Sequence, residues 1–426
     1  MRNRFQRLIQ TAAVFVLSAN LAAQVLPRAA PDEVGLSSER LARIDAVMQE
    51  HVDQKKVAGV VTLIARKGKL AHLGVYGMAG IEANKQMAED TIFRIASMTK
   101  PITSVAVMML YEEGKFLLSD PVGKYIPEFQ EMEVLPPAGA TNNYRVPAER
   151  PMTIRHLLTH TSGLTYGDAG LRALYEAYEI PSGLGPVDGA ILEKMKVLGR
   201  LPLAFHPGER YNYGLSVDVL GALVEVWSGM TFAEFLEERV FGPLGMKDTH
   251  FYLPEDKAAR LAQVYRREEG KPIEPSPERV MPDSDALTTS YPYKGPRTYF
   301  SGGAGLSSTA MDYARFCQMM LNGGELDGVR LLSPATVKLM TMDHARKIAG
   351  YGAPSFGLGF FVDSAKSGFT ELTSEGTHGW GGFWYTQFFI SPEKEMIGVF
   401  MAQLQPTGGL RLDAKFKGLA HQAIVE

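Results

Sequence analysis

The sequence predicts an α/β fold in which one domain is made from both ends of the chain and is interrupted by a largely helical insertion. Strand-like patterns occur near both termini, and short helical patches between Pro- and Gly-rich stretches fill the middle. With 426 residues, the chain is longer than a usual single domain. We therefore expect residues 24–101 and 345–426 to form the α/β domain and residues 102–344 to form the helical domain.

The first 23 residues differ in character from the rest of the chain. A basic start, "MRNRFQR", is followed by the mostly apolar and small residues of "LIQTAAVFVLSANLAA". That order is typical of a secretory signal peptide, so we expect residues 1–23 to be one and the protein to be periplasmic or secreted. The alternative is a frayed N-terminal helix on a cytoplasmic protein.

The elements of the expected α/β domain follow in order. Residues 36–56 have helical spacing after a serine cap, and residues 58–79 have the pattern of two strands joined by a "KGK" turn. Near the other end, a change of period predicts three strands and a closing helix, at 356–363, 381–391, 395–403 and 409–425.

The insertion is expected to contain several helices. "TSVAVMMLYEEGK" is nearly all apolar, so that helix should be buried on most sides. "TIRHLLTHTSG" and "SVDVLGALVEVWSG" are shorter helical patches. Residues 309–325, "TAMDYARFCQMMLNGGE", predict another helix, which ends at two glycines.

Charge and composition exclude several classes of function. The formal net charge of −3 gives no electrostatic argument for binding nucleic acid or acidic membranes. The single cysteine, Cys317, excludes an intrachain disulfide and a cysteine-based metal cage. After the N-terminal segment no run reaches about 18 uninterrupted apolar residues, so we expect no membrane span.

The stretch "FRIASMTKPITS" places Ser97 three residues before Lys100 at the expected start of a helix. A serine hydroxyl is a weak nucleophile and needs a base. Residues three apart share a helix face, and the positive end of the helix favours a serine alkoxide over a charged lysine. The pair can therefore act as nucleophile and base. The spacing alone is a weak signal, because Ser391 and Lys394 repeat it in "SPEK", an expected surface turn.

Two further stretches add context to this pair. In "HPGERYNYGLSVDVLG", Tyr213 comes just before a helical run, and a tyrosine hydroxyl can pass protons when a cation lies beside it. Tyr211, in the same stretch, is the next candidate. "GTHGWGGFWYTQFF" has four glycines in seven residues before a strand. Such a strand allows close approach to a ligand, and its edge could present an N–H to an oxyanion.

Taken together, Ser-Met-Thr-Lys at 97–100, Tyr-Gly-Leu at 213–215 and "HGWGG" resemble the serine β-lactamase and penicillin-binding superfamily. The connecting text, such as "MTIRHLLTHTSGL" and "GGAGLSSTAMDYARFCQMML", looks like class C β-lactamase-type sequence over roughly residues 32–405. This resemblance implies a β-lactamase-like fold: an antiparallel sheet flanked by helices, with a mainly helical domain inserted.

Two departures from the class C pattern favour esters over β-lactams as substrates. Class C enzymes carry Tyr-x-Asn, whereas the third position here is Leu215. They also carry Lys-Thr-Gly on the strand, whereas this chain has Thr-His-Gly at 377–379 or His-Gly-Trp at 378–380. The loss of the strand lysine removes a charge-assisted contact to a β-lactam carboxylate. With "WGG", these features resemble the family VIII carboxylesterases, which implies hydrolysis of simple, most often short-chain, carboxylic esters.

The resemblance also implies a set of residue roles. Ser97 attacks the ester carbonyl, Lys100 and Tyr213 take its proton, and the oxyanion lies between the N–H of Ser97 and that of Trp380 or Gly381. The residues expected to bind substrate lie beside these groups or in a covering segment at about 165–200: His378, Gly379, Trp380, Gly382, Leu215, Tyr175 and Tyr178. No metal or organic cofactor is expected, and the partner is a small-molecule ester.

Some of these roles have alternatives. His378 either binds substrate or only supports the strand. Trp380, Trp384 and Tyr385 could line a pocket for a neutral acyl or alkyl group. Because side chains alternate along a strand, we expect Trp380 and Trp384 on one face and Tyr385 on the other.

Motifs of other hydrolases and of metal sites are missing or incomplete in this sequence. An α/β-hydrolase would need Gly-x-Ser-x-Gly, and no serine here has that frame. His156 and His160 in "RHLLTH" have metal-binding spacing but lack the glutamate of His-Glu-x-x-His, so we expect helix packing. Within the superfamily, a β-lactamase, a D-alanyl-D-alanine peptidase or a transacylase remains an alternative. An inactive scaffold would have no reason to keep a serine that a fluorophosphonate labels.

Overall fold

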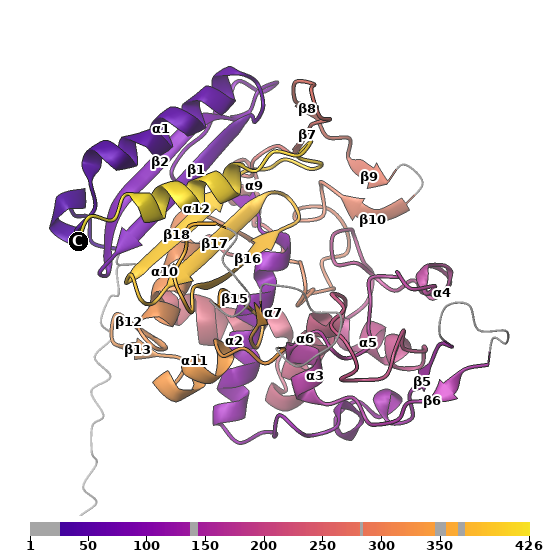
Figure 1. The fold of residues 1–426 in the computed structure, drawn as a ribbon. Helices are drawn as coiled ribbons and strands as arrows, with labels where there is room; N and C mark the ends of the chain where they lie inside the picture. The colour runs from indigo at the N-terminus through magenta and orange to yellow at the C-terminus, as the bar shows by residue number, and fades with distance from the viewer. Residues whose placement is uncertain (1–25, 137–143, 282–283, 346–354, 365–370) are drawn as a thin grey trace, which may run out of the picture.

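The computed structural model places an eight-stranded antiparallel sheet beside a large helical region (Figure 1). The structure describes the chain over 26–136, 144–281, 284–345, 355–364 and 371–426. The expected signal peptide, residues 1–23, lies outside the described residues. The β-lactamase-like architecture predicted from the sequence is confirmed: an antiparallel sheet with strands from both ends of the chain, flanked by helices.

The sheet has the strand order β14-β15-β16-β17-β18-β1-β2-β3. The N-terminal part supplies β1 (Gly59–Arg66), β2 (Lys69–Gly80) and β3 (Lys85–Gln86). The C-terminal part supplies β14 (Ser355–Phe356), β15 (Phe361–Val362), β16 (His378–Gly382), β17 (Thr386–Ser391) and β18 (Met396–Met401). The two parts join where β1 pairs with β18. Both of these central strands are buried along their whole length, because helices cover both faces of the sheet.

Three helices cover the two faces of the sheet. α1 (Ser38–Asp53) and α12 (Leu412–Gln422) pack together on one face, and α10 (Ala310–Leu321) packs on the other (Figure 1). In α1 the buried apolar residues Leu41, Ile44 and Met48 recur at helical spacing. Burial of this single stripe explains why an otherwise polar helix lies on the sheet.

The helical region is built around α2 (Thr99–Glu112) and α6 (Ser216–Ser228), which pack against each other. The apolar run predicted to be buried on most sides is buried from Thr99 to Leu110. The other α-helices are α3 (Ile154–Leu158), α4 (Arg172–Ala177), α5 (Ile191–Gly199), α7 (Phe232–Leu236), α8 (Gly242–Leu244), α9 (Glu255–Ala258) and α11 (Pro334–Met340).

Short elements complete the described chain. A π-helical turn spans Glu237–Phe241, and 3₁₀ turns span Pro31–Val34, Ala96–Met98, Val122–Lys124 and Pro127–Phe129. Five two-stranded pairs are β4 (Phe93–Arg94) with β11 (Ser307–Ser308), β5 (Glu133–Val134) with β6 (Val146–Pro147), β7 (Tyr265–Arg266) with β8 (Glu274–Pro275), β9 (Arg279–Met281) with β10 (Ser284–Thr288), and β12 (Glu325–Leu326) with β13 (Val329–Arg330).

Across the described ranges, no single helix is long and apolar enough to cross a membrane. α6 and the helical residues Phe232–Leu244 reach that length only together, and they meet at an angle of 83°.

Two predicted strands are interrupted by turns. Residues 356–363 form a hairpin of β14 and β15, because Gly359 adopts φ +91° and a Cβ there would lie 2.1 Å from the Ser104 hydroxyl. Residues 381–391 are also not one strand. A turn over 383–385, with Tyr385 at φ +75°, separates β16 from β17. The strand alternation expected for Trp384 and Tyr385 was therefore wrong.

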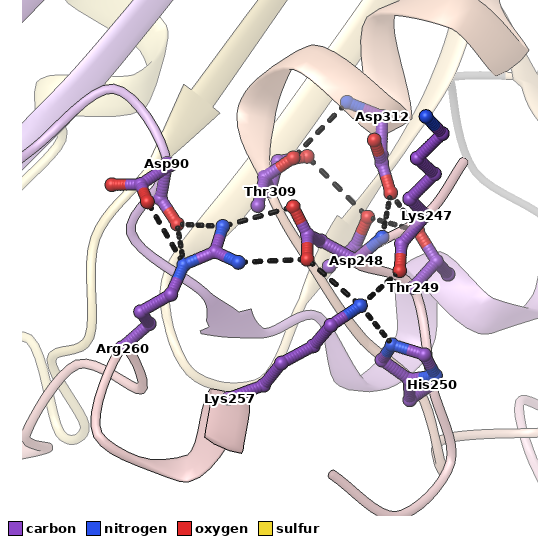
Figure 2. Close-up of polar contacts among 10 residues, drawn as sticks. Asp90, Lys247, Asp248, Thr249, His250, Lys257, Arg260, Thr309 and Asp312 are labelled. Carbon is purple, nitrogen blue, oxygen red and sulfur yellow. Dashed lines mark hydrogen bonds and ion pairs between the residues drawn. The ribbon is translucent and has the colours of Figure 1, made fainter. Parts of the chain in front are cut away.

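A charged network holds the segment that leads into the Ser97 turn (Figure 2). The Arg260 guanidinium donates to both carboxylate oxygens of Asp248, at 2.8 and 2.9 Å, and to the Asp90 carbonyl. Lys257 adds an ion pair to Asp248 at 3.1 Å. Backbone hydrogen bonds between Ile92 and the 260–262 segment extend this contact to β4. The network therefore fixes the chain a few residues before Ser97.

Asp312 is the buried acid of this network, and it should make stability depend on pH. Its carboxylate accepts from the Asp248 N–H at 2.7 Å and the Thr249 hydroxyl at 3.0 Å (Figure 2), yet burial raises its pKa to about 6. The folded state therefore binds more protons than the unfolded state between about pH 4 and 6. The free energy of unfolding that this protonation contributes is lost as pH rises through that window. In Asp312→Asn, which lacks the titrating group, the unfolding free energy should rise relative to wild type by up to about 3 kcal/mol between pH 4 and 7. Urea unfolding of both proteins at four pH values measures this difference, and a difference that does not change with pH would contradict it.

Candidate active site

Ser97 lies in the 3₁₀ turn between β4 and α2, one residue after a strained position. Ala96 is fully buried at φ +40°, a conformation that residues with a Cβ rarely adopt. The turn is held by backbone hydrogen bonds from Ile95 to the Leu306 carbonyl and from Met98 to the Ile95 carbonyl. Ser97 itself is half-buried. The strained turn thus presents the serine at the front of α2, as the sequence predicted.

Lys100 is almost fully buried, with 1% of its surface exposed, and donates three hydrogen bonds. Its Nζ lies 3.3 Å from Ser97 Oγ, 3.0 Å from the Tyr166 hydroxyl and 2.7 Å from the Gly303 carbonyl. An ammonium group has three N–H donors, which matches these three acceptors. A neutral amine has two N–H donors and one lone pair, so it can still donate twice and accept the Ser97 proton. The site therefore accommodates both states of the lysine.

Tyr213 contacts the same serine from the other side. Its hydroxyl donates to Ser97 Oγ at 2.6 Å, and the Trp380 indole N–H lies 3.4 Å from that hydroxyl. The Lys100 Nζ lies over the tyrosine ring, 4.4 Å from its centroid. The Tyr213 side chain is thus held between the Lys100 amine and the Trp380 indole. The structure thus brings the three predicted residues Ser97, Lys100 and Tyr213 into direct contact.

Sequence reasoning missed Tyr166 and Gly303. Tyr166 is 37% exposed as a residue, but its hydroxyl points inward to Lys100. Burial of that hydroxyl, with the nearby Tyr213 and Asp218, raises the pKa of Tyr166 well above its usual value, so the hydroxyl keeps its proton. Tyr166 follows "HTSGL" at the start of the segment expected to cover the site, and this was the only signal that could have found it.

The glycine-rich strand β16 lies against the Ser97 turn. A Cβ on Gly382 would lie 2.4 Å from the Ile95 carbonyl, so only glycine allows this approach. Within the described chain, β15 pairs with β16 only at His378 and Gly379, so the same edge of β16 has no strand partner from Trp380 onward. Trp380 and Gly381, the expected oxyanion donors, are half-buried on this stretch.

Several predicted substrate contacts are placed elsewhere by the structure. Leu215 is 1% exposed and Tyr175 is 5% exposed, and both pack in the main core, whereas Tyr178 is exposed to solvent. The covering segment reaches Lys100 through Tyr166 instead. Gly379 is buried, and a Cβ there would lie 2.2 Å from the Phe388 carbonyl, so it serves strand packing.

His378 is also buried, as expected for a histidine that only supports the strand. It is 2% exposed, its Nδ1 lies 3.0 Å from the Gly376 carbonyl, and its ring packs edge-on against Phe360. Burial lowers its pKa to about 4, so the imidazole is neutral. A neutral, buried histidine does not replace the strand lysine as a cation for substrate.

The aromatic side chains near Ser97 differ in part from those expected. Trp380 packs against Tyr213, Phe356 and Phe361, with ring centroids 5.6, 5.3 and 6.2 Å away. Tyr211 extends this row through Phe356. Trp384 is fully buried in a separate cluster with Tyr291 and Ala96, and Tyr385 packs in the core under α12. Of the three expected pocket aromatics, only Trp380 lies beside Ser97.

Comparisons with known proteins identify a matching family and several similar chains. A family model described as Beta-lactamase matches residues 44–422. Esterase EstB from Burkholderia gladioli is 33% identical over 364 residues, which cover 82% of this chain and 86% of EstB. Among solved structures, EstCE1, described as a hydrolase with promiscuous acyltransferase activity, aligns with a TM-score of 0.74 at 27% identity over 91% of this chain and 98% of EstCE1.

A second solved structure shows a likeness of fold. Simvastatin synthase (LovD) from Aspergillus terreus aligns with a TM-score of 0.74 at 24% identity, over 91% of this chain and 98% of LovD. The family model covers most of the chain, and its match coincides with the sheet and helices that carry Ser97, Lys100 and Tyr213. This chain belongs to the β-lactamase family.

Proposed function

We propose that this protein is a serine carboxylesterase that works through an acyl-enzyme intermediate, with Ser97 as nucleophile. The observation that carries the proposal is the position of Ser97 Oγ, which lies within hydrogen-bond distance of both the Tyr213 hydroxyl and the Lys100 amine. Two groups that can take its proton therefore meet at one weak nucleophile.

In the acylation step, Ser97 Oγ bonds to the ester carbonyl carbon and its proton passes to Lys100, directly or through Tyr213. The carbonyl oxygen becomes an oxyanion, which the backbone N–H groups of Ser97 and of Trp380 or Gly381 are positioned to stabilise. Collapse of this intermediate breaks the ester C–O bond. The leaving alkoxide takes a proton from Tyr213, which Lys100 resupplies.

In the deacylation step the same groups act on water. Lys100 and Tyr213 remove a proton from a water molecule that attacks the acyl carbon, and the proton returns to Ser97 Oγ as the acid leaves. Tyr166, which keeps its own proton, holds Lys100 through both steps.

The surroundings of Ser97 favour a neutral ester with an apolar acyl or alkyl group. No lysine or arginine occurs on β16, and the histidine on that strand is buried and neutral. The half-buried rings of Tyr211, Phe361 and Trp380 instead offer apolar surface. A β-lactam or peptide carboxylate would gain no charged partner from this strand.

Initial rates on p-nitrophenyl butyrate and on nitrocefin, measured side by side, test this proposal. We expect turnover of the ester to exceed that of the β-lactam by at least about 10²-fold, because a missing charge-assisted contact is worth a few kcal/mol. Comparable rates on the two substrates would overturn the preference for esters and favour a β-lactamase.

A transacylase is a second candidate function. The acyl-enzyme can pass its acyl group to an alcohol instead of water, and the similar EstCE1 is described as having promiscuous acyltransferase activity. Adding 1-butanol to the p-nitrophenyl butyrate reaction distinguishes the two. A transacylase would release p-nitrophenol mainly with butyl butyrate, whereas a hydrolase would release it mainly with butyric acid.

A further inference from the structure

A fully buried carboxylate lies behind the lysine of the active site. Asp218 is in the first turn of α6 and has no exposed surface. Its Oδ1 accepts hydrogen bonds from the Ser301 hydroxyl at 2.6 Å and the Tyr299 hydroxyl at 3.2 Å. A buried carboxylate is unfavourable unless it is hydrogen-bonded and faces a positive charge. Both donors are neutral, so the positive charge comes from another residue.

The second oxygen of Asp218 lies against Gly303, the residue whose carbonyl accepts from Lys100. A Cβ on Gly303 would lie 2.4 Å from Asp218 Oδ2 and 3.2 Å from the Tyr166 hydroxyl. The Gly303 backbone approaches Oδ2 and offsets part of the rise in pKa that burial causes. No group in the described chain donates to this oxygen with normal hydrogen-bond geometry. A single glycine thus separates the carboxylate from the amine of Lys100.

The loop that contains Gly303 is clamped between two helices. On the α2 side, Lys100 donates to the Gly303 carbonyl at 2.7 Å and Thr103 donates to the Gly302 carbonyl at 2.8 Å. On the α6 side, Asp218 holds the loop through Ser301. The position of the carbonyl in front of Lys100 therefore depends on Asp218.

We propose that Asp218 is a positioning residue that fixes the Gly303 carbonyl on Lys100 and supplies the negative charge that stabilises the protonated lysine. This inference rests on the proposed function. When Ser97 attacks, its proton moves to Lys100, and the new ammonium then faces the Asp218 carboxylate across Gly303. Asp218 stays ionised and exchanges no proton.

The charges around this pair support a direct coupling. Burial raises the pKa of Asp218, and this shift is opposed first by the hydrogen bond from Ser301 and then by the nearby Lys100. Because the attraction between opposite charges is mutual, the Asp218 carboxylate also attracts an ammonium group on Lys100 across Gly303. The other titratable groups that face the pair are Tyr166, Tyr213 and Tyr299, which hold their protons or donate them, and His160, which burial keeps neutral.

The test is the pH dependence of kcat/KM for p-nitrophenyl butyrate in Asp218→Asn. The amide keeps an oxygen for Ser301 and Tyr299 but removes the charge. Lys100 should then lose its proton more readily and be a weaker base. We expect the acid limb of the profile to move to lower pH by roughly one unit and the plateau to fall about tenfold.

Asp312→Asn is the matched control. Asp312 is also a buried acid at the third position of its helix, α10, but it bonds to Asp248 and Thr249 rather than to the Lys100 site. This variant should keep the wild-type acid limb and plateau. Ser301→Ala, which removes one donor but keeps the carboxylate, should move the acid limb in the same direction as Asp218→Asn by a smaller amount.

An Asp218→Asn profile that falls without moving its acid limb would mean a purely structural role and would overturn the proposal, as would an unchanged profile. Should Asp218→Asn not fold, an unmoved acid limb in Ser301→Ala overturns it equally. Failure here is distinct from failure of the proposed function, which would appear as ester hydrolysis that survives in Ser97→Ala.

Discussion

Ser97→Ala is expected to lower kcat for ester hydrolysis by at least about 10⁴-fold, because no acyl-enzyme can form without the Oγ nucleophile. The fold should persist. Removing one hydroxyl leaves almost no cavity, and Lys100 keeps its hydrogen bonds to Tyr166 and Gly303. We expect the unfolding free energy to change by no more than about 1 kcal/mol. Initial rates on p-nitrophenyl butyrate and a thermal unfolding curve measure the two effects.

The second Ser-x-x-Lys copy provides a control for this experiment. Ser391 ends β17, is fully buried and shares hydrogen bonds with the hydroxyls of Ser374 and Thr377, while Lys394 pairs with Glu393. Ser391→Ala should therefore keep full activity although it loses some stability. A fluorophosphonate should label wild type and Ser391→Ala but not Ser97→Ala. Labelling or turnover that survives in Ser97→Ala would refute the nucleophile assignment.

The centre of the site could be predicted because its signals are local in sequence. Ser97 and Lys100 are three residues apart, so the start of one helix brings them together. Tyr213 precedes a helical run in a stretch that resembles a known family motif. The structure places the hydroxyl of Tyr213, and not that of Tyr211, on Ser97 Oγ. Glycines in β16 indicated a close backbone approach, which Gly382 shows against Ile95.

The supporting residues could not be predicted because they come from distant parts of the chain. Tyr166 and Gly303 reach Lys100 from 66 and 203 residues away. Asp218 has the sequence context of an ordinary acid in the first turn of a helix, where it is usually a surface residue. Only the packing of α2 against α6 shows that it is buried behind Lys100.

The errors in the expected pocket have a common cause in backbone turns and burial. Trp384 was placed by strand alternation, but the positive φ at Tyr385 bends the chain there and carries Trp384 into a separate core cluster. Leu215 and Tyr175 are apolar or aromatic residues that the main core buries. A sequence pattern indicates that such residues avoid water, but it does not indicate whether protein or substrate covers them.

Tyr213→Phe is expected to lower kcat/KM for p-nitrophenyl butyrate by about 10³-fold, which corresponds to roughly 4 kcal/mol. The phenylalanine ring keeps the packing against Trp380 and the contact with the Lys100 amine. It loses only the hydroxyl that donates to Ser97 Oγ and lies beside the indole N–H. The lost activity therefore reports proton transfer rather than folding, and the melting temperature should change little.

Two matched substitutions make this assignment specific. Tyr166→Phe removes an acceptor of Lys100 but leaves Ser97 and Tyr213 in contact, so we expect a loss of about tenfold, as for one neutral hydrogen bond. Tyr211→Phe keeps the ring that packs against Phe356 and His160, and it should be close to wild type. The expected order of activity is Tyr211→Phe, then Tyr166→Phe, then Tyr213→Phe. If Tyr166→Phe were the most damaged variant, Lys100 and Tyr166 would form the proton-transfer pair, and Tyr213 would only orient the serine.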